Sequence, residues 1–383
     1  MAEQLNHTSS EAVYVDFSTA SMSIAQARVV MRRSNKVVWV TDWIESIPRL
    51  GMGQFDFVAC PGVLHHLKNS QNGLNILKDA QIRNGGSMLL VYGKYGRTGV
   101  YQIQHLLRII NIHRKIMNQE LGNANHVLKV LPENHWFHHI PNGDHKTMGQ
   151  IGVYDLLLHK RDVSFAIPDL YEWLRRSNLY LIDFSAPRVR IGLSLKLTIT
   201  EISFYERLKK VSTAKQRSIA ELRSGVYTVQ QFYASKREKS EASVEMLANV
   251  IYSHGSPIGI RSTLANRRNL VQLRNKTYVY ANLQATSLDI HIATFAWPSN
   301  EFTNFAITVL TEKPIKAQSL LEIISSYKEA FNSSVSIEGL KQDFKEFWDY
   351  IKDTGLFLTK KKYVGIFPKT CCINQFAVKG ISA

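Results

Sequence analysis

Residues 55–67 read FDFVACPGVLHHL, an apolar strand pattern that breaks into a Pro-Gly turn and then into a pair of histidines. Open α/β sheets place their ligands at the carboxyl ends of such buried strands. Further along the chain, Asn84, Gly85 and Gly86 are expected to turn the chain into a second apolar strand, SMLLVY, over residues 87–92. Strand, turn, helix, Gly-Gly turn and strand together predict a βαβ unit.

These segments resemble a known family. FDFVACPGVLHHL, GLNILKDAQIRNGG and SMLLVYGKYGR are similar to the fourth and fifth strands of class I S-adenosylmethionine-dependent methyltransferases, and the similarity runs from about Val13 to Phe184. The resemblance implies a Rossmann-like, doubly wound α/β sheet and S-adenosylmethionine as cofactor. It also implies the reaction, in which a substrate oxygen, nitrogen or carbon displaces the sulfonium methyl in line, mainly through proximity and orientation.

The resemblance also assigns residues to the cofactor. VYVDFS, over residues 13–18, matches the family's second strand and gives Asp16 the ribose hydroxyls, while KVVWVTDW, over residues 36–43, gives Asp42 and Trp43 the adenine. The chemistry agrees, because a carboxylate can accept two hydrogen bonds from a vicinal diol. An indole beside a carboxylate offers a purine both a flat apolar surface and an acceptor for its amine. With the bend after the fourth strand, the expected cofactor-binding residues are Asp16, Asp42, Trp43, Cys60 and Gly62.

One departure from the family concerns its first strand and Gly-rich loop. Only residues 1–12 precede Val13, and they contain no glycine with which the backbone could approach a cofactor closely. We therefore expect an amino-terminally truncated sheet in which two buried strands lack their shared neighbour, at roughly 1 to 3 kcal/mol for each unsatisfied backbone group. Two explanations stay open: a shortened product of a longer methyltransferase, or a degenerate relative that does not bind the cofactor and is inactive.

His65 and His66 are the catalytic candidates, because an imidazole at this strand end could remove the proton of an attacking oxygen or nitrogen near neutral pH. The alternative is that the pair only shapes the turn and the following helix. For Cys60 the alternative to a role at the cofactor is a buried packing thiol.

The segment from residue 93 to about residue 162 is expected to be a lid over the cofactor, beginning with a long helix from Val100 to about Leu121. Substrate-binding candidates at its borders are Tyr92, Tyr95, Tyr154 and His159. His135, His138, His139, Asp144 and His145 crowd together within the lid, but they lack a known ligand spacing, so we predict no metal site.

Composition limits the class of protein and its partners. The chain has 383 residues, 45% of them hydrophobic, which predicts two globular domains. Neither a membrane-spanning run nor a secretory or transit signal is evident, so we expect a cytoplasmic protein without a membrane partner. A net charge of +16 allows an acidic partner such as RNA or simply a solvated basic surface. The acceptor, whether small molecule, protein or RNA, and the oligomeric state are not readable from the sequence.

A second, α+β domain is expected over residues 199–383. Charged helical stretches are predicted at Tyr205–Ser224, Val226–Lys239 and Glu241–His254. Near the end, helices at 315–331 and 337–353 followed by short strands at 355–359 and 363–367 suggest a winged-helix-like module. Such modules bind nucleic acid in some proteins and only pack or dimerise in others. The alternative to an enzyme is therefore a non-catalytic binding or regulatory protein that contacts RNA through its basic surface.

Overall fold

The computed structural model describes residues 11–33, 36–112, 116–140, 143–185, 189, 192–195, 202–238, 250–253, 270–273, 276–285, 290–298, 300–312, 318–351, 357–360 and 372–376. The chain divides into two compact units: the first comprises residues 1–184, 221–239 and 367–383, and the second comprises residues 185–220 and 240–366. The domain boundary was expected near residue 198, whereas the chain first leaves the first unit after residue 184. Residues 221–239 and 367–383 belong to the first unit again.

A mainly parallel sheet forms the first unit, with strand order β2-β1-β14-β3-β4-β7-β6 and β5 beside β4. This sheet, together with its helices, confirms the predicted Rossmann-like α/β class. The strands are β1 (Glu11–Val15), β2 (Val37–Val40), β3 (Phe55–Pro61), β4 (Gln81–Gly93), β5 (Ser164–Phe165), β6 (Tyr180–Phe184), β7 (Val229–Ser235) and β14 (Cys372–Phe376).

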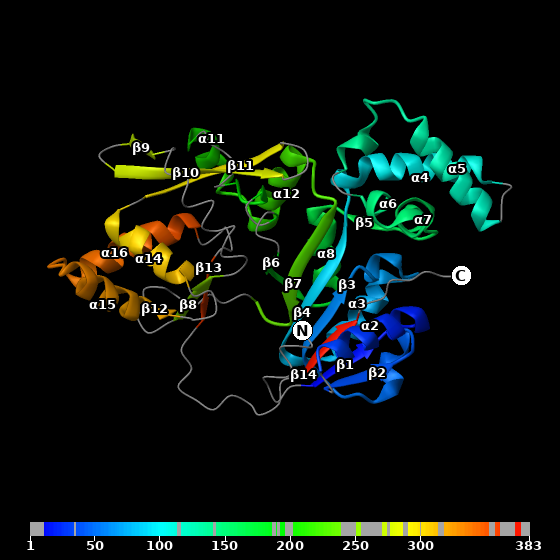
Figure 1. Ribbon diagram of the computed structural model, residues 1–383, viewed down its shortest axis with the longest axis horizontal. Coiled ribbons are helices and arrows are strands. Elements are labelled where there is room, and N and C mark those ends of the chain that lie inside the picture. Colours follow the sequence, from blue (N-terminus) through cyan, green and yellow to red (C-terminus); the bar gives the residue numbers. More distant parts are fainter. Residues whose placement is uncertain are drawn as a thin grey trace. The chain divides into compact units, whose positions relative to one another are not determined.

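The carboxyl-terminal strand β14 lies in the centre of this sheet, parallel to β1 on one side and to β3 on the other (Figure 1). Asn374 is the register partner of both Val13 and Val58. The expectation that β1 and β3 lack a shared neighbour is therefore wrong for this chain, because a strand from its other end pairs with both. The seven residues after β14, at 377–383, lie outside the described part.

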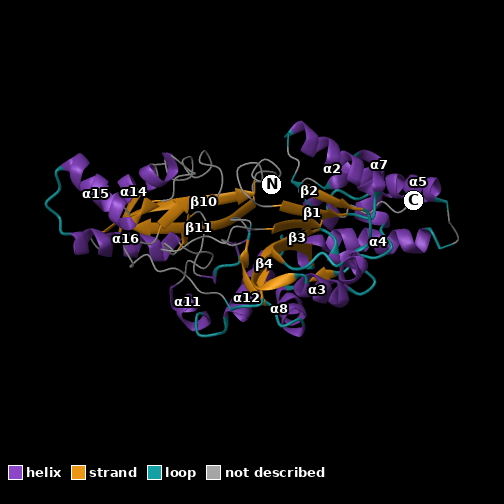
Figure 2. Cartoon of the chain, turned by 90° about the horizontal axis from the view of Figure 1, so that it is seen from below, coloured by secondary structure: helices purple, strands orange, loops and turns teal. Residues whose placement is uncertain are grey.

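Crossover helices α2 (Thr19–Met31) and α3 (Ser70–Asp79) lie on opposite sides of the strands (Figure 2). Ser18 caps α2: its Oγ accepts a hydrogen bond from the Ser21 backbone N–H at 3.2 Å. Asn69 caps α3 in the same way, accepting from the Asn72 N–H at 2.9 Å. Such caps satisfy backbone donors that have no partner inside a helix.

Strand β4 begins at Gln81, so the expected Gly-Gly turn is instead part of a strand. The pairing with β3 is irregular at this point, since Phe55 opposes Gln81 whereas Phe57 opposes Gly86. A Cβ on Gly85 would lie 2.9 Å from the carbonyl oxygen of Asp56. The glycine therefore serves a close approach of two backbones within the sheet and not a reversal of the chain.

The segment expected to be a lid, from residue 93 to about residue 162, is a set of short helices between β4 and β5, and we call it the lid segment. The single helix expected from Val100 is two helices, and a buried cluster that includes Val100, Leu107, Ala124 and Leu156 joins them to the segment before residue 159. The elements of the lid segment are η3 (Tyr95–Arg97), α4 (Thr98–Ile110), α5 (Met117–Lys129), η4 (Trp136–His139), α6 (Asp144–Thr147), α7 (Gly149–Val153) and the π-helical turn η5 (Tyr154–Leu158). Helix α8 (Ile167–Arg176) follows, with Pro168 in its first turn, where the missing N–H of proline has no helical partner to lose.

The helix expected over Val226–Lys239 is wrong. This segment contains β7, which runs antiparallel between β4 and β6. Its side chains alternate between half-buried and buried, and Gln230, Phe232 and Ala234 face the interior. This period of two is that of a strand.

The second unit holds helices and two small sheets. Helix α12 runs across the boundary into the first unit, and the stretch Tyr205–Ser224 is broken into two helices. Of the predicted helix Glu241–His254, the described residues form strand β8 instead. The elements are α11 (Ile202–Leu208), α12 (Thr213–Ser224), β8 (Val250–Ser253), β9 (Leu270–Leu273), β10 (Lys276–Ala285), β11 (Ile290–Pro298), α14 (Glu301–Glu312), β12 (Gln318–Ser319), α15 (Leu320–Phe331), α16 (Ile337–Ile351) and β13 (Phe357–Lys360).

The winged-helix-like interpretation is only partly covered by the described residues. Helices α15 and α16 correspond to the two predicted helices, and β13 pairs antiparallel with β8. The predicted strand at 363–367 lies outside the described part, so the interpretation stays a prediction. Among the helices that the structure describes, none has both the length and the apolar character needed to cross a membrane.

Candidate functional site

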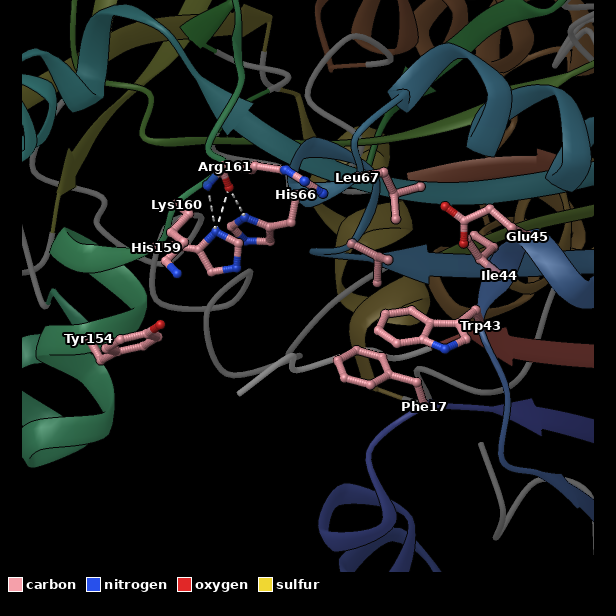
Figure 3. Close-up of a pocket in the computed structure, with 11 residues that line it drawn as sticks. Phe17, Trp43, Ile44, Glu45, His66, Leu67, Tyr154, His159, Lys160 and Arg161 are labelled. Carbon is pink, nitrogen blue, oxygen red and sulfur yellow. Dashed lines mark hydrogen bonds between the residues drawn. The ribbon is translucent and has the colours of Figure 1, made fainter. Parts of the chain in front are cut away.

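A cavity of about 340 Å³ lies in the first unit at the edge where the parallel strands end. Its walls come from the segments that follow β1, β2 and β3, from η5 and from the segment that follows η5 (Figure 3). Its lining residues are Phe17, Trp43, Ile44, Glu45, Val63, His66, Leu67, Tyr154, His159, Lys160 and Arg161. This is the edge at which open α/β sheets bind ligands, and the volume lies within the range of small-molecule sites.

Two stacked aromatic rings form one end of the cavity. The rings of Phe17 and Trp43 are nearly parallel, with an interplanar angle of 5° and centroids 4.2 Å apart. The Trp43 side chain is 57% exposed, so one face of the indole is open to a ligand. Ile44, Val63 and Leu67 also line the cavity. A flat apolar surface of this kind suits a purine ring.

Asp42 fixes the turn that carries Trp43. Its Oδ1 accepts hydrogen bonds from the Ser46 hydroxyl at 2.6 Å and from the Trp43 N–H at 2.8 Å, and Arg49 pairs with Oδ2 at 2.9 Å. The bond from Ser46 is the main cause that lowers the pKa of Asp42. Asp42 is not a lining residue of the cavity, and its contacts position the Trp43 backbone. Its role toward an adenine stays a prediction.

Asp16 directly precedes Phe17 and is fully buried. Its Oδ1 accepts from the Ser18 N–H at 2.8 Å, and its Oδ2 accepts from the Tyr14 hydroxyl at 3.2 Å. Burial raises the pKa of Asp16, although both hydrogen bonds act against that shift. Asp16 is therefore next to the cavity along the chain without lining it, and its ribose role is untested.

Histidines form the opposite end of the cavity. The rings of His66 and His159 lie with centroids 4.0 Å apart, and Nδ1 of each is within hydrogen-bond distance of the Arg161 carbonyl oxygen, at 2.8 Å and 2.5 Å. Because a carbonyl oxygen can only accept, Nδ1 of neutral His66 carries the proton and Nε2 keeps its lone pair. Tyr154 lines the same end (Figure 3). The structure thus brings together three of the predicted residues: His66, Tyr154 and His159.

His65 and Tyr92 pack behind this wall. The His65 ring is fully buried and lies 3.9 Å from the Tyr92 ring and 4.2 Å from the His66 ring, measured between centroids. Burial lowers the pKa of His65 well below its ordinary value, and burial is also the main cause that lowers the pKa of His66. Both imidazoles are therefore neutral near pH 7, as a proton acceptor must be.

The remaining predicted residues do not line the cavity. Cys60 is fully buried in β3, and burial raises the pKa of its thiol. Gly62 has a φ of +78°, in the left-handed region that favours glycine, and turns the chain toward His65 and His66. Tyr95 is half-buried at the start of η3. In the described part of the chain, no three potential ligands from His, Cys, Asp and Glu gather into a metal-binding group.

Sequence reasoning missed a buried ion pair beside the histidines. The Arg97 guanidinium lies 3.0 Å from Oδ2 of Asp162, and their side chains are 5% and 0% exposed. The Arg97 Cζ also lies 3.6 Å from the centroid of the Tyr92 ring. The only available signal was a pair of opposite charges at the two borders of the lid segment, and a separation of 65 positions along the chain hides such a contact.

Comparisons with known proteins agree with this fold. Residues 1–89 match a family model described as a methyltransferase domain. An uncharacterised protein of Synechococcus sp., syc1184_c, is 24% identical over 190 residues, which are 46% of this chain and 43% of that protein. The chain thus spans less than half the length of this relative.

Solved structures extend the likeness over nearly the whole chain. PKMT2 from Rickettsia typhi superposes with a TM-score of 0.60 at 12% identity, over 94% of this chain and 68% of that one. Its complex with AdoHcy gives a TM-score of 0.59 at 9% identity, over 92% and 67%. At such identities the likeness concerns the fold alone.

Proposed function

We propose that the cavity of the first unit binds S-adenosylmethionine and that His66 takes the proton of the methyl acceptor. The amino-terminal part of the chain is a class I S-adenosylmethionine-dependent methyltransferase domain. The observation that carries the proposal is a single cavity with an aromatic stack at one end and a neutral imidazole at the other. The adenine would stack on the open face of Trp43, beside Phe17.

The residues fit this cofactor on two counts. The exposed indole face supplies the stacking surface that a purine needs, and base–aromatic stacking contributes about 1–3 kcal/mol. The Asp42 contacts hold the Trp43 turn in place before any ligand arrives, which lowers the cost of binding. When bound, S-adenosylmethionine would supply an activated methyl group on a positively charged sulfur.

His66 would act on the acceptor. The hydrogen bond from its Nδ1–H to the Arg161 carbonyl leaves Nε2 to take a proton from an attacking O–H or N–H group. His159 and Tyr154 line the same wall and would limit where the acceptor lies. His65 is the weaker candidate, because its ring is fully buried and does not line the cavity.

Titration calorimetry with S-adenosylhomocysteine tests cofactor binding. Saturable binding is expected for the intact chain, and Trp43→Ala should weaken it about tenfold or more, because it removes a stacking face. Trp136→Ala is the matched control: Trp136 is 61% exposed in the lid segment and does not line the cavity. Absence of heat with the intact chain, or equal affinity of the two variants, would contradict the proposal and favour the non-catalytic alternative.

Methyl transfer needs a separate assay, since the acceptor is not identified. The protein would be incubated with methyl-labelled S-adenosylmethionine and a cell extract, and the labelled products would be sorted by size and by sensitivity to protease or ribonuclease. These arms distinguish a small molecule, a protein and an RNA. His66→Gln should reduce labelling by about 10²–10⁴ and should weaken S-adenosylhomocysteine binding less than Trp43→Ala does, because His66 lines the end of the cavity opposite the aromatic stack. Undiminished labelling would remove His66 from the chemistry.

A further inference from the structure

We propose that Arg97 and Asp162 are a buried positioning pair that holds residues 159–161 against His66 and so completes the wall of the cofactor cavity. Neither residue lines the cavity, so they would act through others and not on a ligand. The inference rests on the proposed function for its catalytic meaning, but the geometry that it describes can be tested without any cofactor.

Every polar atom of the Asp162 carboxylate has a partner. Oδ2 accepts from Arg97 at 3.0 Å and from the Gln104 side-chain amide at 2.8 Å, and Oδ1 accepts from the Tyr101 hydroxyl at 3.4 Å. Gln104 also donates to the Leu156 carbonyl in η5 at 2.9 Å. A charge taken fully out of water requires such partners, and removing one of them leaves the other charge uncompensated.

Arg97 joins this carboxylate to the sheet. Its guanidinium covers the ring of Tyr92 at the end of β4, and its Nε donates to the Tyr101 hydroxyl on α4 at 3.3 Å. The same Tyr92 ring contacts both His65 and His66, with centroids 3.9 Å and 5.5 Å away. Asp162 is therefore linked, through Arg97 and the Tyr92 ring at the end of β4, to both histidine rings.

The neighbours of Asp162 on both sides bond to the histidine pair. The Arg161 carbonyl accepts from His66, and the Val163 N–H donates to the His65 carbonyl at 3.1 Å. Only one residue separates these two contacts, and it is the residue that the ion pair holds. A shift of Asp162 would therefore move both contacts and would carry His159 away from the His66 ring.

The alternative to a positioning role is that the pair only stabilises the fold. The pKa of His66 distinguishes these two roles. The groups that face His66 are His65, His159, Tyr92, Asp155 and Asp162. Burial is the main cause that lowers its pKa, whereas the charge of Asp162 raises it. If Asp162 acts only as a charge, Asp162→Asn lowers the pKa further. If Asp162 positions the covering segment, the variant exposes the imidazole. Relief of burial, the largest cause, and of the His159 charge then outweighs loss of the Arg161 hydrogen bond, which raises the pKa, so the pKa of His66 rises toward its ordinary value.

The experiment is a nitrogen NMR titration of the histidine rings in the full chain. We expect the pKa of His66 to rise in Asp162→Asn and, to a smaller extent, in Arg97→Lys, which keeps the charge but loses the planar fork. Asp155→Asn is the matched control, because it removes a carboxylate near His66 that is outside the ion pair. In this variant the pKa of His66 should fall. A fall in the pKa of His66 in Asp162→Asn, or no change in it, would overturn the inference. If Asp162→Asn does not fold, the same measurement in Arg97→Lys decides the question.

Binding of S-adenosylhomocysteine keeps this inference separate from the proposed function. If the intact chain binds, Asp162→Asn should weaken the affinity about tenfold, because three lining residues belong to the segment that it releases. Unweakened binding in that variant would count against positioning. If the intact chain does not bind, the proposed function fails, and the NMR titration still decides whether the pair positions the wall.

Discussion

The imidazole of His66 lies on the imidazole of His159, with centroids 4.0 Å apart and an angle of 41° between the ring planes. The two residues come from different parts of the first unit, since His66 ends the turn after β3 and His159 follows the π-helical turn of the lid segment. Both contact the Arg161 carbonyl oxygen through Nδ1. The Arg161 backbone thus contacts both rings at the cavity wall, and for His159 its N–H also lies 3.2 Å from Nδ1.

The first prediction concerns this pair. His159→Ala should raise the pKa of His66, because it removes a nearby cation-forming ring and part of the cover that keeps water from His66. The same nitrogen NMR titration measures the change. His126→Ala, at an exposed position on α5, is the control and should leave His66 unchanged. An unaltered His66 titration in His159→Ala would show that the rings are not in contact in solution.

The second prediction concerns Glu221, a carboxyl group buried between α8 and β7. Its Oε2 accepts from the Ile167 N–H at 2.8 Å and its Oε1 accepts from the Gln230 amide at 2.7 Å. Burial raises its pKa from 4.5 to about 7. The folded protein therefore keeps a proton that the unfolded chain releases, and the free energy of unfolding should fall as the pH rises from 4.5 to about 7.

Glu221→Gln tests whether the free energy of unfolding falls with rising pH because of this carboxyl group. The variant cannot ionise, so between pH 4.5 and pH 7 it should lose less stability than the natural protein, by at most about 3 kcal/mol. Urea denaturation at several pH values measures the free energy of unfolding. Hydrogen exchange of the Ile167 amide at the same pH values reports the stability of the first unit alone. Parallel pH profiles for the two proteins would contradict the prediction.

The third prediction uses a glycine at the end of β4. A Cβ on Gly93 would collide with the carbonyl oxygen of Tyr227, and the Gly93 N–H also donates to the Thr228 carbonyl at 2.9 Å. Gly93→Ala should lower the free energy of unfolding by about 1–3 kcal/mol, because two backbones would have to separate. Thermal denaturation measures the loss.

Gly122 supplies the control for this substitution. It lies in the middle of α5 with open space where a Cβ would be built. Gly122→Ala should therefore be neutral or stabilising by up to about 1 kcal/mol, through helix propensity alone. If both alanine variants melt at the same temperature, β4 and Tyr227 do not approach each other as closely as described.

The fourth prediction concerns the central strand β14. Asn374→Pro should destabilise the first unit, because proline removes a backbone donor and disturbs the ladders to both β1 and β3. Asn374→Thr keeps the donor and serves as control. The measurement is amide hydrogen exchange at Val13 and Val58, which should accelerate in the proline variant only. Equal exchange in both variants would show that β14 does not occupy the centre of the sheet.

Local sequence patterns were sufficient for much of the nucleotide half. The apolar run ending at Cys60 and the turn at Gly62 predicted strand β3 and the edge at which the cavity lies, and the resemblance to the family predicted the strand that begins near Val13. His66 could be named from its place after a strand end, whereas Trp43 was named from the resemblance to the methyltransferase family. These features depend on residues close together in the chain, where side-chain periodicity and turn geometry act directly.

The contacts between distant segments could not be read in this way. Residues 226–239 are predicted to be a charged helix, yet Val229–Ser235 pairs with β4 on one side and with β6 on the other. The contact of His66 with His159, the pair of Arg97 with Asp162 and the insertion of β14 beside β1 each join residues far apart in sequence. Side-chain burial and strand pairing determine these contacts. Both depend on which surfaces the folded chain brings together, and a local sequence pattern does not contain that information.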